Sequence, residues 1–189
     1  MRSDISKVKL SFSDITAGKV FYQSETGYKF STDSIELFNY IKKYKSQKFI
    51  ELGCGDGIIS VLYALEYPDS QVYSLDINLC FIENLKLTIA NNHIKNITVI
   101  HEDLIFYSIY SKQKYDIVII NSPYYKCCEG KLNENINALI AKHQILCDEN
   151  DFLTAARRLT DNAGKFVFIY PAYKINSWLL GKIRRIGFD

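Results

Sequence analysis

The amino-acid sequence predicts an α/β fold with a doubly wound parallel sheet, on the basis of three observations. Short apolar runs rich in Val, Ile, Phe and Tyr recur from Lys48 onward, without the polar alternation of a half-exposed strand. Helix-like segments separate these runs, and the connections between strand and helix are short. This alternation is typical of a parallel sheet that helices cover on both faces.

Five strands and four helices are expected between Lys48 and Tyr170, and a further, amphipathic helix is expected to begin near Tyr173. The strands are Lys48–Leu52, Gln71–Leu75, Ile97–His101, Tyr115–Ile120 and Lys165–Tyr170. The helices are Ile58–Tyr67, Leu79–Asn91, a short one after Asp103, and Asp148–Thr160. Pro68 should end the first helix, Asn78 should cap the second, and the turn residues Asn162–Gly164 should stop the last.

The residues before Lys48 have a different pattern. Lys9–Phe12 and Lys19–Tyr22 predict a pair of strands. Asp33 and Glu36 then have the spacing of a capping box, with Asp33 as the N-cap of an amphipathic helix. The apolar stripe of that helix would consist of Ile35, Leu37, Phe38 and Ile41. We expect residues 1–189 to form one domain, with 1–47 as a strand pair and helix and 48–189 as the core.

Composition and charge narrow the class of protein. Hydrophobic residues make up 48% and charged residues 23% of the chain, which is ordinary for a globular protein and argues against disorder. A net charge of +2 excludes a polycation, but it allows a nucleic-acid partner to bind through a local basic patch. No segment has the length of a membrane span or the apolar core of a secretory signal. Five cysteines without a CxxC pair indicate free thiols in a reducing cytoplasm, and no metal site is expected.

A glycine-rich loop, Glu51–Gly57, follows the first buried strand and precedes a helix. Glycines at 53, 55 and 57 let the backbone turn sharply and approach a ligand closely. Ile58 stands where the dinucleotide-binding pattern GxGxxG has its last glycine. The loop instead resembles the first motif of the class I methyltransferases that depend on S-adenosylmethionine (SAM), whose sheet is Rossmann-like. The resemblance implies that Gly53, Gly55 and Gly57 wrap the methionine part of SAM and that Glu51 helps to hold it.

Two further acids follow the next two strands. Asp76 can accept hydrogen bonds from both ribose hydroxyls of an adenosine, whether in SAM or in NAD. Asp103, taken alone, predicts a helix cap, but the resemblance implies that it accepts from the exocyclic amine of the SAM adenine. Ile77 and Leu104, which follow the two acids, are assigned to the same cofactor site.

Asn121–Tyr125, with the sequence NSPYY, follows the fourth strand. It resembles the Asn-Pro-Pro-Tyr motif of methyltransferases that modify a planar amino nitrogen, a poor nucleophile because its lone pair is delocalised. The amide oxygen of Asn121 and the carbonyl of Ser122 can accept both N–H bonds of such a nitrogen and direct its lone pair at the methyl group. The resemblance makes Asn121, Ser122, Pro123 and Tyr124 the catalytic set, and Asn121 is also counted with the cofactor residues. Tyr124 would stack on an extruded base and Pro123 would stiffen the turn, whereas Ser122 replaces a proline and loses stiffness.

The substrate is predicted from the segment ahead of the glycine loop. Gly27–Phe38 is similar to the start of the bacterial tRNA adenine-N6 methyltransferases that modify the adenine beside the anticodon of a valine tRNA, and Ala141–Gln144 resembles a later segment of that family. The resemblance implies methyl transfer from SAM to N6 of an adenine in tRNA. Protein-glutamine N5 and ribosomal RNA guanine-N2 methylation are alternatives. Alternatives of another class are a nicotinamide-dependent oxidoreductase and a non-catalytic SAM- or nucleotide-binding module.

The expected partners are tRNA and, at residues 165–170, another protein or a second copy of the chain. Basic groups beside the pocket should contact tRNA, and the N-terminal ones are Lys7, Lys9, Lys19, Lys29, Lys42, Lys43, Lys45 and Lys48. Arg157, Arg158, Arg184 and Arg185 form other basic groups, which are usually solvated faces. The sheet of the resembled family ends in an antiparallel strand pair, which this chain should lack because it stops at Asp189. We therefore expect a truncated gene product, or a partner or second copy that covers the apolar edge at residues 165–170.

Overall fold

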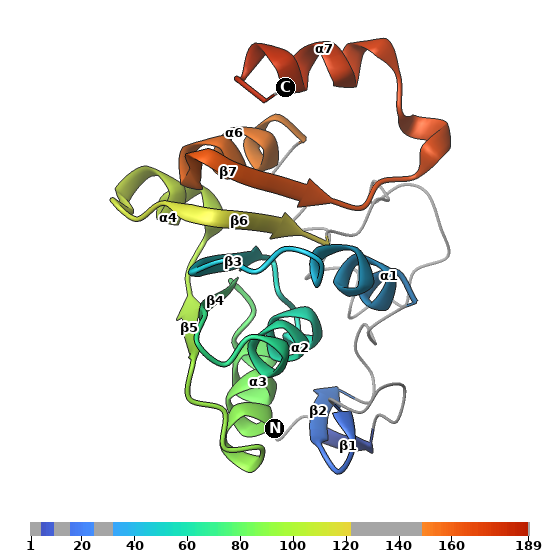
Figure 1. The fold of residues 1–189 in the computed structure, drawn as a ribbon, viewed down its shortest axis with the longest axis vertical. Helices are drawn as coiled ribbons and strands as arrows, with labels where there is room; N and C mark the ends of the chain where they lie inside the picture. The colour runs from blue at the N-terminus through green and yellow to red at the C-terminus, as the bar shows by residue number, and fades with distance from the viewer. Residues whose placement is uncertain (1–4, 10–15, 25–31, 122–148, 189) are drawn as a thin grey trace.

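The computed structural model describes residues 5–9, 16–24, 32–121 and 149–188 (Figure 1). Its centre is a parallel sheet of five strands in the order β5-β4-β3-β6-β7. The strands are β3 (Lys48–Leu52), β4 (Gln71–Asp76), β5 (Ile97–His101), β6 (Tyr115–Ile120) and β7 (Thr160–Phe168). The helices between them are α2 (Ile58–Glu66), α3 (Leu79–Asn91), α4 (Leu104–Tyr110) and α6 (Glu149–Leu159). The predicted doubly wound α/β architecture is therefore confirmed.

Both faces of this sheet are buried because alternate strand residues enter two separate cores. On β3, Phe49 faces the core formed with α1 and α2, where its ring stacks on Tyr63 at a centroid distance of 4.1 Å. Ile50 and its neighbour Val118 on β6 face the opposite core, which contains Ala156 of α6. Such two-sided burial explains why the strands read as continuous apolar runs in the sequence.

The last strand differs from its prediction at both ends. It begins at Thr160, directly after α6, and ends at Phe168, whereas the sequence indicated a loop at residues 162–164 and a strand over 165–170. Tyr115 pairs with Thr160 and Ile117 with Lys165, so the turn residues bulge out of the ladder without ending the strand. Gly164 permits this approach, since a Cβ there would lie 2.8 Å from the backbone oxygen of Tyr115. The strand is at the edge of the sheet, as predicted.

An antiparallel hairpin of β1 (Ile5–Lys9) and β2 (Val20–Ser24) lies beside α3 (Figure 1). The strand pair was predicted, although β1 begins earlier than expected and residues 10–12 lie outside the described residues. The outer edge of β2 is held by helix side chains. The Thr88 hydroxyl accepts from the backbone N–H of Tyr22 at 3.0 Å, and the Asn92 side chain bonds both the N–H and the carbonyl of Val20.

Helix α1 (Thr32–Ile41) precedes the sheet in the chain and contributes to the core. It begins before Asp33, so the prediction of Asp33 as the N-cap is wrong. The Asp33 carboxylate lies in the first helical turn, where the helix dipole favours a negative charge. The expected stripe is largely confirmed, since Leu37, Phe38 and Ile41 are buried and Ile35 is half-buried. Ser34 is also buried on this side of the helix, which the apolar pattern did not indicate.

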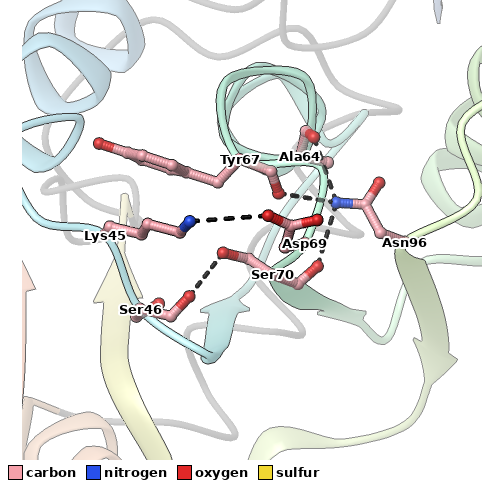
Figure 2. A network of polar contacts seen from close by, with 7 residues as sticks. All are labelled: Lys45, Ser46, Ala64, Tyr67, Asp69, Ser70 and Asn96. Carbon is pink, nitrogen blue, oxygen red and sulfur yellow. Dashed lines mark hydrogen bonds and ion pairs between the residues drawn. The ribbon is translucent and has the colours of Figure 1, made fainter.

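At the amino ends of the strands, polar contacts connect the loops (Figure 2). The Asn96 side-chain nitrogen donates to the backbone carbonyls of Ala64, Tyr67 and Ser70 at 3.0–3.1 Å. The Ser70 hydroxyl donates to the carbonyl of Ser46. These bonds satisfy carbonyls in the last turn of α2 and just beyond it, and they fix the start of β4 against the start of β3.

After β7 come a short 3₁₀ helix, η2 (Ala172–Lys174), and helix α7 (Ser177–Arg185). The ring of Phe188, just beyond α7, stacks on Phe166 of β7 at 5.3 Å, and the Arg157 guanidinium lies over the same ring. Figure 1 shows α7 along the outer side of β7 and α6. Among the described residues, no helix has the length and apolar character needed to cross a membrane.

Candidate active site

Four sequence-predicted positions meet at one edge of the sheet. The glycine loop follows β3, Asp76 ends β4, Asp103 follows β5 and Asn121 follows β6. These strands are parallel neighbours, so their carboxyl ends lie side by side. The chain proceeds from β3 to β4 and β5 on one side and returns to β6 on the other. This reversal of strand order is where open α/β sheets bind their ligands.

Glycine is needed at the three loop positions for two different structural reasons. All three adopt positive φ angles, +69° at Gly53, +55° at Gly55 and +76° at Gly57. A Cβ on Gly53 or Gly55 would have no atom within 4 Å, so these two positions leave open space beside the backbone. A Cβ on Gly57 would collide with the side chain of Leu85 on α3. Gly57 is therefore required by packing, whereas Gly53 and Gly55 leave room for a ligand.

Hydrogen bonds from the end of β4 hold the loop in place. The backbone N–H groups of Gly53 and Cys54 both donate to the Leu75 carbonyl, at 2.8 and 2.9 Å. Asp76 accepts from the N–H of Gly55 through Oδ2 and from that of Asn78 through Oδ1, both at 2.8 Å. Asp76 is only 9% exposed. The carboxylate assigned to the ribose thus also fixes the glycine loop, a contact that strand pairing creates and the sequence did not indicate.

Two further acids of the loop have raised pKa values. Glu51 is buried and accepts from the N–H and the hydroxyl of Ser60, at 2.9 and 2.5 Å. Burial raises the pKa of Glu51 to about 8, and the nearby charge of Asp76 adds to the rise. Burial also raises the pKa of Asp56 to about 6, although a hydrogen bond from Asn84 at 2.9 Å acts in the opposite direction. A cationic group bound beside the loop would stabilise both carboxylates in their ionised form.

Cys54 lies inside the same loop and is buried as a free thiol. Burial is the main cause that raises its pKa well above the ordinary value, with further contributions from Asp76 and Glu51. A thiol in such surroundings is not a reactive thiolate. Cys80 is also free and exposed, and the other three cysteines lie outside the described residues.

Asp103 acts as a helix cap in this structure. Its Oδ1 accepts from the N–H groups of Ile105 and Phe106, at 2.8 and 3.0 Å, which is the local alternative that the sequence left open. Leu104 is buried in the core below. The Ile77 carbonyl is hydrogen-bonded to the His101 ring at 2.9 Å, so the ends of β4 and β5 are joined. The sequence did not single out His101, because its partner is defined only once the two strands are adjacent.

Asn121 bonds to a residue from the other end of the sequence. Its side-chain nitrogen donates to the hydroxyl of Ser34 on α1 at 2.8 Å, and Ser34 is only 3% exposed. Because the nitrogen and oxygen of an amide point in opposite directions, this bond helps to determine where the Asn121 oxygen points. The sequence analysis missed Ser34; its one signal was a position three residues ahead of Leu37, on the buried side of α1. Ser122, Pro123 and Tyr124, like Ala141–Gln144, lie outside the described residues.

Solved structures share the fold of this chain. A SAM-dependent methyltransferase from Agrobacterium tumefaciens superposes with a TM-score of 0.63 at 15% identity, covering 96% of this chain and 57% of its own. Trm5b from Pyrococcus abyssi has a TM-score of 0.63 at 21% identity, covering 89% of this chain and 44% of its own. The fold is that of the class I SAM-dependent methyltransferases.

The chain belongs to the methyltransferase small domain family, whose model matches residues 28–168. The predicted cofactor, SAM, is thereby confirmed.

The chain also resembles curated proteins at low sequence identity. A tRNA1(Val) (adenine(37)-N6)-methyltransferase from Vibrio campbellii is 24% identical over 148 residues, which are 78% of this chain and 60% of the relative. A bifunctional methyltransferase from Rickettsia bellii is 32% identical over 125 residues, which are 65% of this chain and 22% of the relative. The chain thus spans less than two thirds of the length of these relatives.

Proposed function

We propose that the protein transfers a methyl group from SAM to an exocyclic amino nitrogen, N6 of an adenine in tRNA. The observation that carries this proposal is the position of Asn121 at the end of β6, next to the glycine loop at the end of β3. A methyl donor on the loop and an amino nitrogen held by Asn121 would then be neighbours. The tRNA adenine is supported by the relative from Vibrio campbellii, which matches 78% of this chain.

The proposed cofactor residues fit SAM on the geometry of the loop. The open space at Gly53 and Gly55 would receive the methionine part, and the acids Glu51 and Asp56 beside it match the positive charge of a sulfonium and an ammonium group. Asp76 would accept from the ribose hydroxyls. SAM, when bound, supplies an electrophilic methyl group.

The adenosine end of the proposed site lies between β4 and β5. Asp103 would accept from the adenine amine with the oxygen that does not cap α4, since both bonds to the helix end on Oδ1. Ile77 and Leu104 would border the adenine, with the Leu104 side chain packed into the core beneath it. The bond between Ile77 and His101 joins the ends of β4 and β5 at this place.

Asn121 would prepare the nucleophile. Its Oδ1 and the backbone carbonyl of Ser122 would each accept one N–H bond of the target amino group, so that the lone pair points at the methyl carbon. Ser34 is a positioning residue in this proposal, because its hydroxyl holds the amide nitrogen of Asn121. Tyr124 would stack on the flipped base and Pro123 would shape the turn, roles that rest on the NSPYY sequence.

Ribosomal RNA is the second candidate substrate. A ribosomal RNA small subunit methyltransferase C from Buchnera aphidicola is 28% identical over 107 residues, 55% of this chain and 30% of the relative. The same Asn121 geometry would serve either nucleic acid, because both present a planar amino nitrogen.

A transfer assay tests the proposal. The protein and labelled SAM are incubated with total tRNA, or with ribosomal RNA, from a strain that lacks the protein, and the nucleosides are separated by mass spectrometry. We expect N6-methyladenosine in tRNA. Label confined to ribosomal RNA or to protein would contradict the tRNA assignment.

The Asn121→Ala variant tests the reaction motif in the same assay. Transfer should be abolished, while the affinity for SAM measured by calorimetry stays nearly unchanged, because Asn121 contacts the target nitrogen. Asn91→Ala, on the exposed side of α3, is the matched control and should retain full activity. Undiminished transfer by Asn121→Ala would disprove the role given to this residue.

A further inference from the structure

The end of the last described segment, residues 165–188, carries an uneven share of the charge. Residues 165–188 contain five basic and no acidic side chains, which leaves a net charge of −3, from 18 basic and 21 acidic residues, on the rest of the chain. We define the α7 surface as the aromatic and basic residues of η2 and α7: Tyr173, Lys174, Trp178, Lys182, Arg184 and Arg185. No acidic residue of the segment neutralises it, so it attracts polyanions.

Aromatic side chains form one end of the α7 surface. Tyr173 is 76% and Trp178 54% exposed, an unusual degree for side chains of this size. They follow the carboxyl end of β7, which is paired through Phe168 with Ile120, the residue before Asn121. The aromatic end thus begins at the carboxyl ends of the strands, where the proposed active site lies. From there, α7 runs back along β7 (Figure 1). Its nine residues extend over about 13 Å.

Lys182 links the aromatic and basic parts. Its ammonium lies 4.3 Å from the centre of the Trp178 ring, a cation–π contact that holds the indole in place. The side chain is 8% exposed, and its nitrogen has no hydrogen-bond acceptor within the part of the chain that the structure describes. Because the ammonium is buried against the indole, Lys182 acts by orienting Trp178, and its nitrogen is not presented to solvent. Arg184 and Arg185 follow it on the helix and are exposed.

The lysines that the sequence analysis expected beside the pocket lie elsewhere in the structure. Lys42, Lys43 and Lys45 follow α1 and precede β3, so they lie at the opposite end of β3 from the glycine loop, and the expectation that they lie beside the pocket is wrong. Lys45 forms an ion pair with Asp69 at 3.6 Å (Figure 2). Lys42 and Lys43 lie over the rings of Phe38 and Tyr40.

We propose that the α7 surface binds the RNA substrate outside the catalytic edge, with Tyr173 and Trp178 stacking on unpaired bases and the exposed Arg184 and Arg185 contacting phosphates. Exposed aromatic rings interleaved with cations are what single-stranded RNA segments recognise. A basic helix with a tryptophan can also bind an anionic membrane surface. RNA is favoured because the aromatic end adjoins the end of the sheet that carries Asn121. This inference rests on the proposed function in requiring an RNA substrate.

The test measures the binding of fluorescently labelled tRNA, transcribed in vitro, by anisotropy over a series of KCl concentrations. Arg184→Ala/Arg185→Ala should weaken binding about tenfold and reduce the slope of log K against log salt by about 1.4 to 1.8, the value for two phosphate contacts. Trp178→Ala should weaken binding about fivefold without changing the slope. Lys86→Ala/Lys95→Ala is the matched control, since it removes the same charge from exposed positions beside α3 and should leave the slope unchanged.

Each outcome separates the two proposals. Three outcomes would overturn the inference. The arginine pair could leave the slope of log K against log salt unchanged, or the lysine pair could lose as much tRNA affinity as the arginine pair. The protein could also bind phosphatidylserine vesicles and not tRNA. SAM affinity and the thermal unfolding midpoint should equal those of the unaltered protein, because both arginines are exposed. If tRNA binds through the α7 surface but is not methylated, the proposed reaction fails while the surface stands. If tRNA is methylated with the same KM by the arginine variant, the surface fails while the reaction stands.

Discussion

The two halves of the sheet, β5-β4-β3 and β6-β7, are stabilised by different interactions. On the side of β3, β4 and β5, hydrogen bonds join the strand ends: Leu75 and Asp76 hold the glycine loop, and His101 holds Ile77. On the side of β7, aromatic contacts predominate, with Phe166 stacked on both Phe168 and Phe188. Asn121 lies between the two sides and is tied to Ser34.

This difference separates the proposed cofactor half from the proposed substrate half. Directional bonds with short loops preorganise the glycine loop, so a ligand there needs little rearrangement of the protein. Stacked rings and exposed cations are less directional, and they suit a large and variable partner such as RNA. Four changes test this comparison.

The largest effect of a single substitution at fixed pH is expected on the packing of the glycine loop. Gly57→Ala should destabilise the protein by about 3 kcal/mol, because the added Cβ meets Leu85 and the residue has a φ of +76°. The measurement is urea unfolding. Gly181→Ala, in α7 with no atom within 4 Å of the new Cβ, is the control and should stabilise slightly. Equal effects of the two changes would mean that the loop is not tightly packed.

The raised pKa of the buried Glu51 predicts that the stability of the protein depends on pH. The pKa of Glu51 is raised from 4.5 to about 8, so between these values the folded protein holds a proton that the unfolded chain releases. The free energy of unfolding should therefore fall as pH rises through this window, by up to about 1.4 kcal/mol for each pH unit. Glu51→Gln keeps an acceptor for Ser60 and should flatten the dependence. Glu66→Gln, at the end of α2, is the control and should not. An unchanged slope in Glu51→Gln would contradict the raised pKa.

A smaller effect is expected where the two halves meet. Ser34→Ala removes the hydroxyl that holds Asn121 and should lower kcat about fivefold, the value of one hydrogen bond, with the KM for SAM unchanged. Ser34→Thr retains the hydroxyl and should restore activity. Ser111→Ala, after α4, serves as the control. A rise in the KM for SAM in place of a fall in kcat would show that Ser34 acts on the cofactor half.

The smallest effect concerns the hairpin beside α3. Thr88→Ala removes the acceptor for the N–H of Tyr22 and should cost about 1 kcal/mol in urea unfolding, without altering SAM affinity. Thr88→Ser, which keeps the hydroxyl, is the matched comparison. Loss of SAM binding in Thr88→Ala would connect the hairpin to the cofactor half.

The local sequence pattern was sufficient to predict the bounds of most strands and helices of the sheet region. β3, β5 and β6 have the predicted bounds, and α3 begins after its predicted cap, Asn78, whose side chain accepts from the N–H of Cys80. These elements are bounded by turn residues and have an apolar pattern that agrees with their burial. The glycine loop and Asn121 were also found from the sequence, because each directly follows a recognisable strand.

The sequence by itself determined the α/β class, the loop at the end of β3 and the residue types of the proposed chemistry, since these depend on neighbours along the chain. Tertiary structure alone decided that Ser34 holds Asn121, that Asp76 holds Gly55, and that Asn162–Gly164 bulges within β7. It also placed the aromatic start of α7 at the edge that carries Asn121, and the lysines before β3 at the opposite edge. The physical reason is that these contacts join residues far apart in sequence, and their partners are defined only by which strands lie side by side.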